Sequence, residues 1–253
     1  MQFDQDFFFF PEVFFAESEK KAINYTFGEH GKEFNQRIKT SIIFSLICLI
    51  IILINVKTLT KFLELPVQDV KFFQLSPNEY FFSSLKLSLY GSLIASFPFY
   101  ISQGIFFLAP GFSYREQKIV FSLIILSNFL FLISLGFTFF ALLPAALTFF
   151  LNYSEGILEP FWSFTEYFDF STTLFLGTAL VFQLPILQVI LSICNVTNQN
   201  QMKNGWKYIV LFSTILGAII TPSTDPITQL ILSSVILVLY GFGIFLTDFY
   251  KKE

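Results

Sequence analysis

The sequence predicts an all-α integral membrane protein in which six transmembrane helices form a bundle. Only 13% of the 253 residues are charged and 54% are hydrophobic, whereas a soluble domain usually carries about 25% charged residues. Long stretches contain no charged residue at all, at positions 87–114, 119–154, 170–202, 208–224 and 226–247. Because about 20 apolar residues in a helix cross the roughly 30 Å hydrocarbon core, these stretches predict membrane spans.

The expected spans, in chain order, are residues 40–56, 80–108, 120–149, 171–194, 208–220 and 227–246. Three of them contain a proline: Pro98 bends the second span, Pro144 lies near the end of the third, and Pro185 lies inside the fourth. Proline removes a backbone donor and kinks a helix, and neighbouring helices can satisfy the freed carbonyl groups. We therefore interpret these prolines as features of helix shape and packing.

The fifth predicted span is short. Its 13 residues form a helix of only about 20 Å at 1.5 Å per residue, less than the thickness of the hydrocarbon core. Either the true helix extends a few residues beyond positions 208–220, or the bilayer is thinned along this flank of the protein.

The distribution of lysine and arginine predicts the orientation. Six spans put both termini on one side of the membrane. That side carries 11 basic residues and the other carries 3, with Lys86 just inside the second span. Because basic residues are enriched in cytoplasmic loops, we expect both termini on the cytoplasmic or stromal side. The expected organisation is an N-terminal segment 1–38, a membrane domain 39–247 and a C-terminal tail 248–253.

Several functional classes are disfavoured. The two cysteines, Cys48 and Cys194, lack the spacing of metal or redox motifs, and His30 has no partners for a catalytic triad. The segment 28–33 lacks the glycine spacing and the final Ser or Thr of a phosphate-binding loop. We therefore expect no enzymatic activity, no cofactor, no metal and no nucleic-acid partner.

The spans themselves are also free of mid-membrane charge. Lys86 can extend to the nearer surface, and the nearest approach to a buried polar group is Gln183. A secondary transporter of a small solute is the alternative function, and it usually needs carboxylates or broken helices near the midplane.

The N-terminal stretch 1–19 carries acidic residues and no basic one, unlike a secretory signal or a transit peptide. This favours either a bacterial protein or one encoded in the organelle where it works. The 38 phenylalanines, together with 13 lysines against 2 arginines, are typical of an A+T-rich genome and favour the organelle.

Six segments, which together cover the chain from about Glu29 onward, form a recognisable series: 29–37 (EHGKEFNQR), 71–82 (KFFQLSPNEYFF), 86–89 (KLSL), 107–111 (FLAPG) followed by Glu116, 182–185 (FQLP) and 221–229 (TPSTDPITQ). This series resembles TatC, the polytopic receptor subunit of the twin-arginine protein translocase, in its cyanobacterial and plastid branch.

This resemblance implies a receptor that binds signal peptides bearing two consecutive arginines and helps to move folded proteins across the membrane with the proton-motive force. It implies signal-peptide-binding roles for Glu33, Glu116, Phe107 and Arg37, because carboxylates bind guanidinium groups in bidentate geometry. It further implies single-span TatA- and TatB-type partners, membrane lipid, a homo-oligomeric receptor complex and a thylakoid location, with the bacterial inner membrane as the alternative.

Simpler interpretations stand beside these roles. Glu33 and Arg37 are four residues apart and could form an ordinary helix-stabilising pair, and neighbouring basic residues could neutralise Glu116. Asp225 could cap the last helix, and Glu79 could serve the first turn of the second. We group Gln183, Pro98, Pro185 and Asp225 as residues of helix packing or partner contact.

The chain also departs from the family pattern at three positions. Asn35 stands where an arginine is common, Gln183 where the fourth span often has glutamate, and Gly241 where the last span often has glutamate. These departures concern partner docking and leave the signal-binding carboxylates in place.

Overall fold

The fold, taken from a computed structural model, is described for residues 27–67, 71–74, 76–109, 114–154, 156, 159, 161–221 and 225–252. Its elements, in chain order, are α2 (Phe27–Ile54), α3 (Val56–Glu64), η2 (Leu65–Val67), β1 (Lys71–Phe73), α4 (Glu79–Leu108), α5 (Tyr114–Phe137), η4 (Thr138–Leu142), α6 (Leu143–Ser154), β2 (Phe161–Ser163), α7 (Phe164–Val181), α8 (Leu184–Ile193), α9 (Gln199–Asn204), α10 (Trp206–Ile220) and α11 (Pro226–Lys252).

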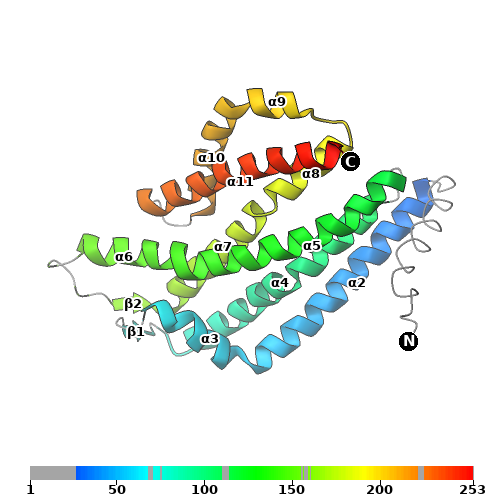
Figure 1. Cartoon of the computed structure of the whole chain (residues 1–253). Helices are drawn as coiled ribbons and strands as arrows, with labels where there is room; N and C mark the ends of the chain where they lie inside the picture. The colour runs from blue at the N-terminus through cyan, green and yellow to red at the C-terminus, as the bar shows by residue number, and fades with distance from the viewer. Residues whose placement is uncertain are drawn as a thin grey trace, which may run out of the picture.

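The prediction of an all-α membrane protein is confirmed. Within the described residues, five helical segments are long and apolar enough to cross a membrane, and α10 is a shorter apolar helix. The starts of α2 and α5 and the ends of α4, α8 and α11 lie at one end of the molecule (Figure 1). The elements α3, β1 and β2 and the end of α6 lie at the opposite end. We call the first of these the near end and the second the far end.

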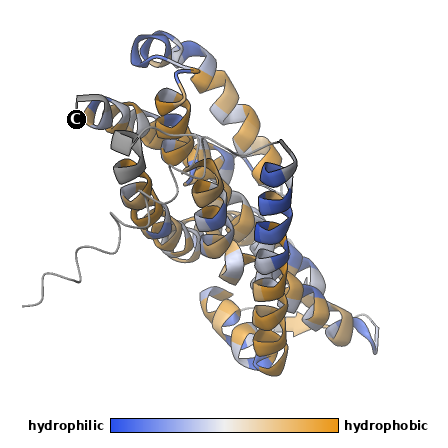
Figure 2. Ribbon diagram, turned by 90° about the vertical axis from the view of Figure 1, so that its right-hand side faces the viewer, coloured by the Kyte–Doolittle hydropathy of each residue, from blue (hydrophilic) through white to orange (hydrophobic). Residues whose placement is uncertain are grey.

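The first helix begins well before the predicted span. α2 starts at Phe27 and not at residue 40, because the polar stretch that precedes the apolar run is rich in Glu, Lys, Gln and Arg, which are good helix formers. Figure 2 shows this helix hydrophilic in its first turns and hydrophobic beyond them. One continuous helix therefore carries polar side chains out of the membrane at the near end.

The third span contains a π-helical turn that the sequence did not predict. Residues Thr138–Leu142 form η4 between α5 and α6, and Pro144 follows directly in α6. The proline ring clashes with the carbonyl group four residues earlier, which here belongs to Phe140 inside η4. A wider turn accommodates that clash without breaking the span.

The fourth span starts earlier than predicted and contains an acidic residue. α7 begins at Phe164, not at residue 171, so Asp169 lies within it. Its carboxylate accepts a 3.0 Å hydrogen bond from the ammonium group of Lys86 on α4, and both side chains are about half exposed. Lys86, which the sequence predicted could extend to the nearer surface, therefore has an ion-pair partner on the neighbouring helix.

The fifth span remains short in the structure. α10 has 15 residues, so the predicted start was two residues late, yet the helix is still only about 22 Å long. It packs tightly on its neighbours, because an added Cβ at Gly177 of α7 would lie 2.1 Å from Cγ2 of Ile220. A Cβ at Gly217 would likewise lie 2.7 Å from the hydroxyl of Ser233 on α11.

Small polar side chains allow α2 and α4 to lie side by side. Ser96 on α4 is fully buried, and its hydroxyl accepts a 2.9 Å hydrogen bond from Ser45 on α2. Small residues at helix interfaces let backbones approach closely in a membrane, and their hydroxyl groups bond within or between helices. This contact fixes α2 against α4 below the near end.

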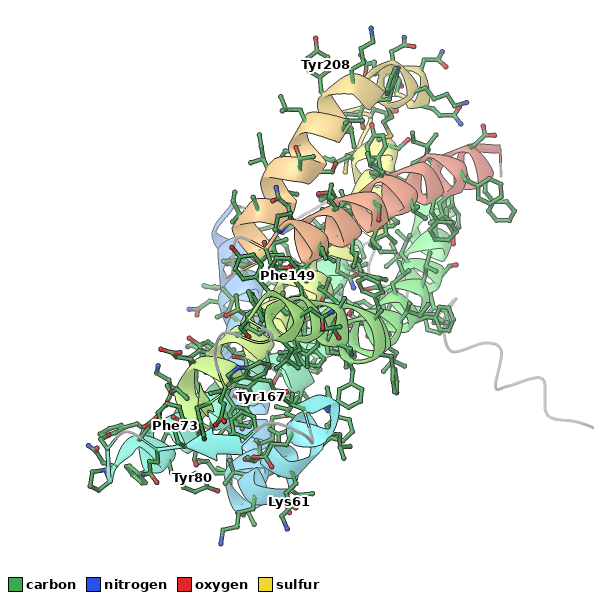
Figure 3. The ribbon with its side chains drawn as sticks, turned by 90° about the vertical axis from the view of Figure 1, so that its left-hand side faces the viewer. Lys61, Phe73, Tyr80, Phe149, Tyr167 and Tyr208 are labelled. Carbon is green, nitrogen blue, oxygen red and sulfur yellow. The ribbon has the colours of Figure 1, made fainter. Side chains whose placement is uncertain are left out.

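The far end is closed by a small cap that includes the two short strands. β1 pairs in parallel with β2, with Phe72 opposite Trp162, and Figure 3 shows Tyr167, Phe73 and Tyr80 clustered at this end. The Tyr167 hydroxyl donates to the backbone carbonyl of Leu63. Sequence analysis predicted no strand here, since three-residue strands carry no recognisable periodicity.

Glu79 in the first turn of α4 holds this cap together. One of its carboxylate oxygens accepts hydrogen bonds from the hydroxyl groups of Ser163 (3.0 Å) and Thr165 (2.9 Å). The amide of Ser76 donates to the other oxygen at 3.4 Å. Glu79 therefore has a structural role, because its side chain joins the starts of α4 and α7.

We predict that Glu79→Ala lowers stability by about 1.5–3 kcal/mol, since hydrogen bonds to a charged group are removed. The check is thermal unfolding of the purified protein in detergent. Glu166→Ala is the matched control, because this exposed glutamate also lies in a first helical turn, that of α7. Equal melting temperatures for the two variants would contradict the assigned role.

Candidate functional site

The strongest polar cluster at the near end begins with an ion pair on α2. Arg37 donates two hydrogen bonds to one oxygen of Glu33, Oε1, from Nε at 3.0 Å and from Nη2 at 2.7 Å. The side chains of Glu33 and Arg37 are only 22% and 27% exposed. The helical spacing that the sequence suggested therefore brings the two groups together, and they lie partly sheltered from solvent.

A third residue, from α4, joins this pair. The guanidinium of Arg37 donates from Nη1 to the amide oxygen of Gln103 at 3.2 Å. Sequence reasoning missed Gln103, because an uncharged amide inside an apolar run gives no electrostatic signal. The available clue was its position, one helical turn before Phe107 on the same helix face.

The second carboxylate oxygen of Glu33 is left without a donor. Oε2 is buried and has no hydrogen-bond partner among the residues that the structure describes. A buried acceptor without a donor costs free energy, and a donor that reached this oxygen would recover that cost.

Glu33 lines a polar hollow of about 520 Å³ at the near end. The other side chains around this hollow come from α2 and α4: Glu29, Lys32, Gln36, Arg37, Thr40 and Gln103. The hollow therefore holds both donors and acceptors, and Glu33 is one of the residues that line it.

An aromatic group borders this cluster. Phe107, near the end of α4, packs against Phe34 with ring centroids 5.2 Å apart, and its ring lies 6.4 Å from that of His30 in an edge-on arrangement. Both partners lie on α2, so Phe107 is not simply lipid-facing. It ties the end of α4 to the polar start of α2.

Glu116, the other predicted carboxylate, lies in the first turn of α5, but its side chain is outside the described part of the structure. The start of α5 lies at the same end of the molecule as the start of α2 and the end of α4 (Figure 1). The backbone thus brings residue 116 to the same end as Glu33. Positions 110–113, which include the Pro-Gly turn, are also outside the described residues.

Gln183 and Pro185 lie at the joint between α7 and α8, whereas Pro98 lies within one helix. Gln183, at the break between α7 and α8, accepts a 2.7 Å hydrogen bond from Ser127 on α5 and donates a 3.3 Å bond to the same residue's carbonyl. Pro185 is buried at the start of α8. Pro98 lies inside α4, which continues through it, and its carbonyl accepts a 2.7 Å hydrogen bond from Ser102.

Asp225 is buried directly before α11. Its carboxylate accepts a 2.9 Å hydrogen bond from the amide of Thr228 and a further one from the hydroxyl of the same residue. This is the geometry of an N-cap, in which a side-chain oxygen satisfies a free donor of the first turn. Gly241, the position in the last helix where the chain departs from the family pattern, is exposed, with nothing within 4 Å of an added Cβ.

The sequence of this chain matches a model of one protein family. The model of the Sec-independent protein translocase protein, TatC, matches residues 29–234, which is most of the chain. The chain belongs to the TatC family.

Individual relatives agree with this membership. The chain is 49% identical over 230 residues to the tatC-like protein ycf43 of Trieres chinensis, covering 91% of this chain and 88% of that protein. It is 41% identical to the translocase protein TatC of Synechocystis, covering 85% of each chain. It is 38% identical to the chloroplastic TATC of Arabidopsis thaliana, covering 86% of this chain and 65% of that protein.

A solved structure shares the architecture. A crystal structure of the twin-arginine translocase receptor TatC superposes with a TM-score of 0.77 at 30% identity, covering 87% of this chain and 99% of that one. The predicted resemblance to TatC is thus confirmed.

Membership in this family settles the broad functional class. TatC is a component of a protein translocase and not an enzyme, and the family acts with TatA and TatB subunits. The chain is a multi-pass membrane protein whose chloroplast and cyanobacterial relatives agree with the predicted thylakoid or plastid membrane.

We predict that Asp225→Asn, which keeps a capping oxygen, retains transport of a twin-arginine cargo, whereas Asp225→Ala loses about 0.5–2 kcal/mol of stability. The measurements are cargo uptake by membranes containing each variant and thermal unfolding in detergent. Loss of transport by a fully stable Asp225→Asn protein would show that the negative charge itself acts in transport.

Proposed function

We propose that this chain is the receptor subunit that binds twin-arginine signal peptides at the near-end hollow and helps to transport folded proteins. The observation that supports this most directly is the buried oxygen Oε2 of Glu33, which has no partner among the described residues. It belongs to a residue that lines the polar hollow of α2 and α4. A guanidinium group is the donor that suits such an oxygen.

The chemistry favours arginine over lysine. Guanidinium is planar, presents its donors in a fixed fork and is weakly hydrated, whereas a lysine ammonium is a compact and strongly hydrated point charge. Glu33 takes one guanidinium in this proposal, and Glu116, from the start of α5, takes the other. Phe107 provides an apolar border to the site, and Arg37 holds Glu33 in place.

The apolar segment of the signal peptide has a complementary surface on the same protein. A large apolar groove of about 680 Å³ lies between α2, α3, α4, α5, η4 and α7, lined for example by Ile52, Leu87 and Phe131. We propose that the apolar segment enters the bilayer from the hollow and lies along this groove. Burial of apolar side chains contributes about 25 cal/mol per Å², which adds affinity without selectivity.

The distribution of basic residues supports one orientation. We propose that the near end, where α2 begins and α11 ends, faces the cytoplasm or stroma, where signal peptides arrive. Transport then uses the proton-motive force and single-span TatA- and TatB-type subunits in a complex that contains more than one copy of this chain. A small-solute transporter has no observation in its favour, since the family is one of protein translocase components.

We predict that Glu33→Gln weakens binding of a twin-arginine signal peptide by about tenfold or more, because a hydrogen bond to a charged group contributes about 1.5–3 kcal/mol. The measurement is equilibrium binding of a fluorescent peptide to the purified full-length protein in lipid nanodiscs. Glu166→Gln, at the far end, is the control and should bind as the wild type does. Unchanged affinity in a folded Glu33→Gln protein would contradict the proposed site.

A further inference from the structure

We propose that Gln103 and Arg37 determine the selectivity of this site, by keeping one oxygen of Glu33 free for an arriving guanidinium. The inference deepens the proposed function and rests on it. Gln103 is a positioning residue here, since it acts through Arg37 and not on the signal peptide itself.

The geometry of the ion pair is the starting point. An arginine and a carboxylate often pair through two parallel hydrogen bonds that use both carboxylate oxygens. In this protein, Nε and Nη2 of Arg37 both converge on Oε1 of Glu33. The guanidinium therefore occupies only half of the carboxylate, and Oε2 stays without a donor among the described residues.

Gln103 explains why the guanidinium stays in this position. Its amide oxygen, on α4, accepts the remaining Nη1 group of Arg37 at 3.2 Å. Without that acceptor, the guanidinium could turn and pair with both oxygens of Glu33. The resident arginine would then fill the position that the signal arginine needs, so Gln103 keeps the site open.

The charge around the hollow gives this free oxygen its importance. Its described lining contains two acidic residues, Glu29 and Glu33, and two basic ones, Lys32 and Arg37. These charges cancel, so a cation gains little from the average field of these residues. Binding depends on the local acceptor, and a buried acceptor favours the weakly hydrated guanidinium over the strongly hydrated ammonium.

The test compares a twin-arginine with a twin-lysine peptide on the full-length protein in nanodiscs. Gln103→Leu should weaken twin-arginine binding about tenfold and leave twin-lysine binding nearly unchanged, so that selectivity is lost. Gln103→Asn keeps an amide acceptor without adding charge and should retain selectivity better than Gln103→Leu. Gln74→Leu removes an exposed amide next to β1 at the far end, outside the hollow, and should behave as the wild type does.

The outcomes separate the two proposals. If the wild type binds both peptides equally, the proposed function fails, and this inference fails with it. If the wild type discriminates and folded Gln103→Leu discriminates equally well, this inference alone is overturned. Gln103→Met, which keeps the side-chain length without the acceptor, gives the same comparison if the leucine variant does not fold.

Discussion

The position of one guanidinium group governs the polar end of this protein. Arg37 bonds Glu33 within α2 and Gln103 across to α4, so a single side chain orients the carboxylate and ties two membrane helices together. Phe107 reinforces the same junction by packing on α2. Hydrogen bonds that involve a charged group are stronger than neutral ones, which makes this contact the one that sets the geometry of the candidate site.

The rest of the bundle is built to keep charge away from the membrane interior. Its buried polar side chains are largely serine and threonine, and they bond to backbone carbonyls or to each other, as Thr138 does with Thr178 between η4 and α7. Unsatisfied polar groups are costly in hydrocarbon, and this pattern satisfies most of them without ions, the side-chain amide of Gln188 being an exception among the described residues. The described acidic and basic groups instead lie toward helix ends, and the half-exposed pair of Lys86 and Asp169 joins α4 to α7.

Hydrophobic runs in the sequence predicted the spans well, but their starts were missed where polar residues continue a helix. α2 and α7 both begin earlier than predicted, because a helix that leaves the membrane keeps its backbone bonds while losing its hydrophobic signal. The parallel pairing of β1 with β2 joins segments far apart in the chain and has no local signature. Motif resemblance pointed to Glu33 and Phe107, whereas the role of Gln103 depends on packing between helices that no sequence pattern reveals.

The most direct test of the account is photo-crosslinking of a signal peptide to the membrane-embedded protein. Gly31 on α2 and Gly104 on α4 suit the photoreactive residue, because nothing lies within 4 Å of an added Cβ at either position. The account predicts adducts at both with a twin-arginine peptide, their loss with a twin-lysine peptide, and none at the exposed Tyr153 at the end of α6. Equal labelling by both peptides, or labelling confined to Tyr153, would contradict it.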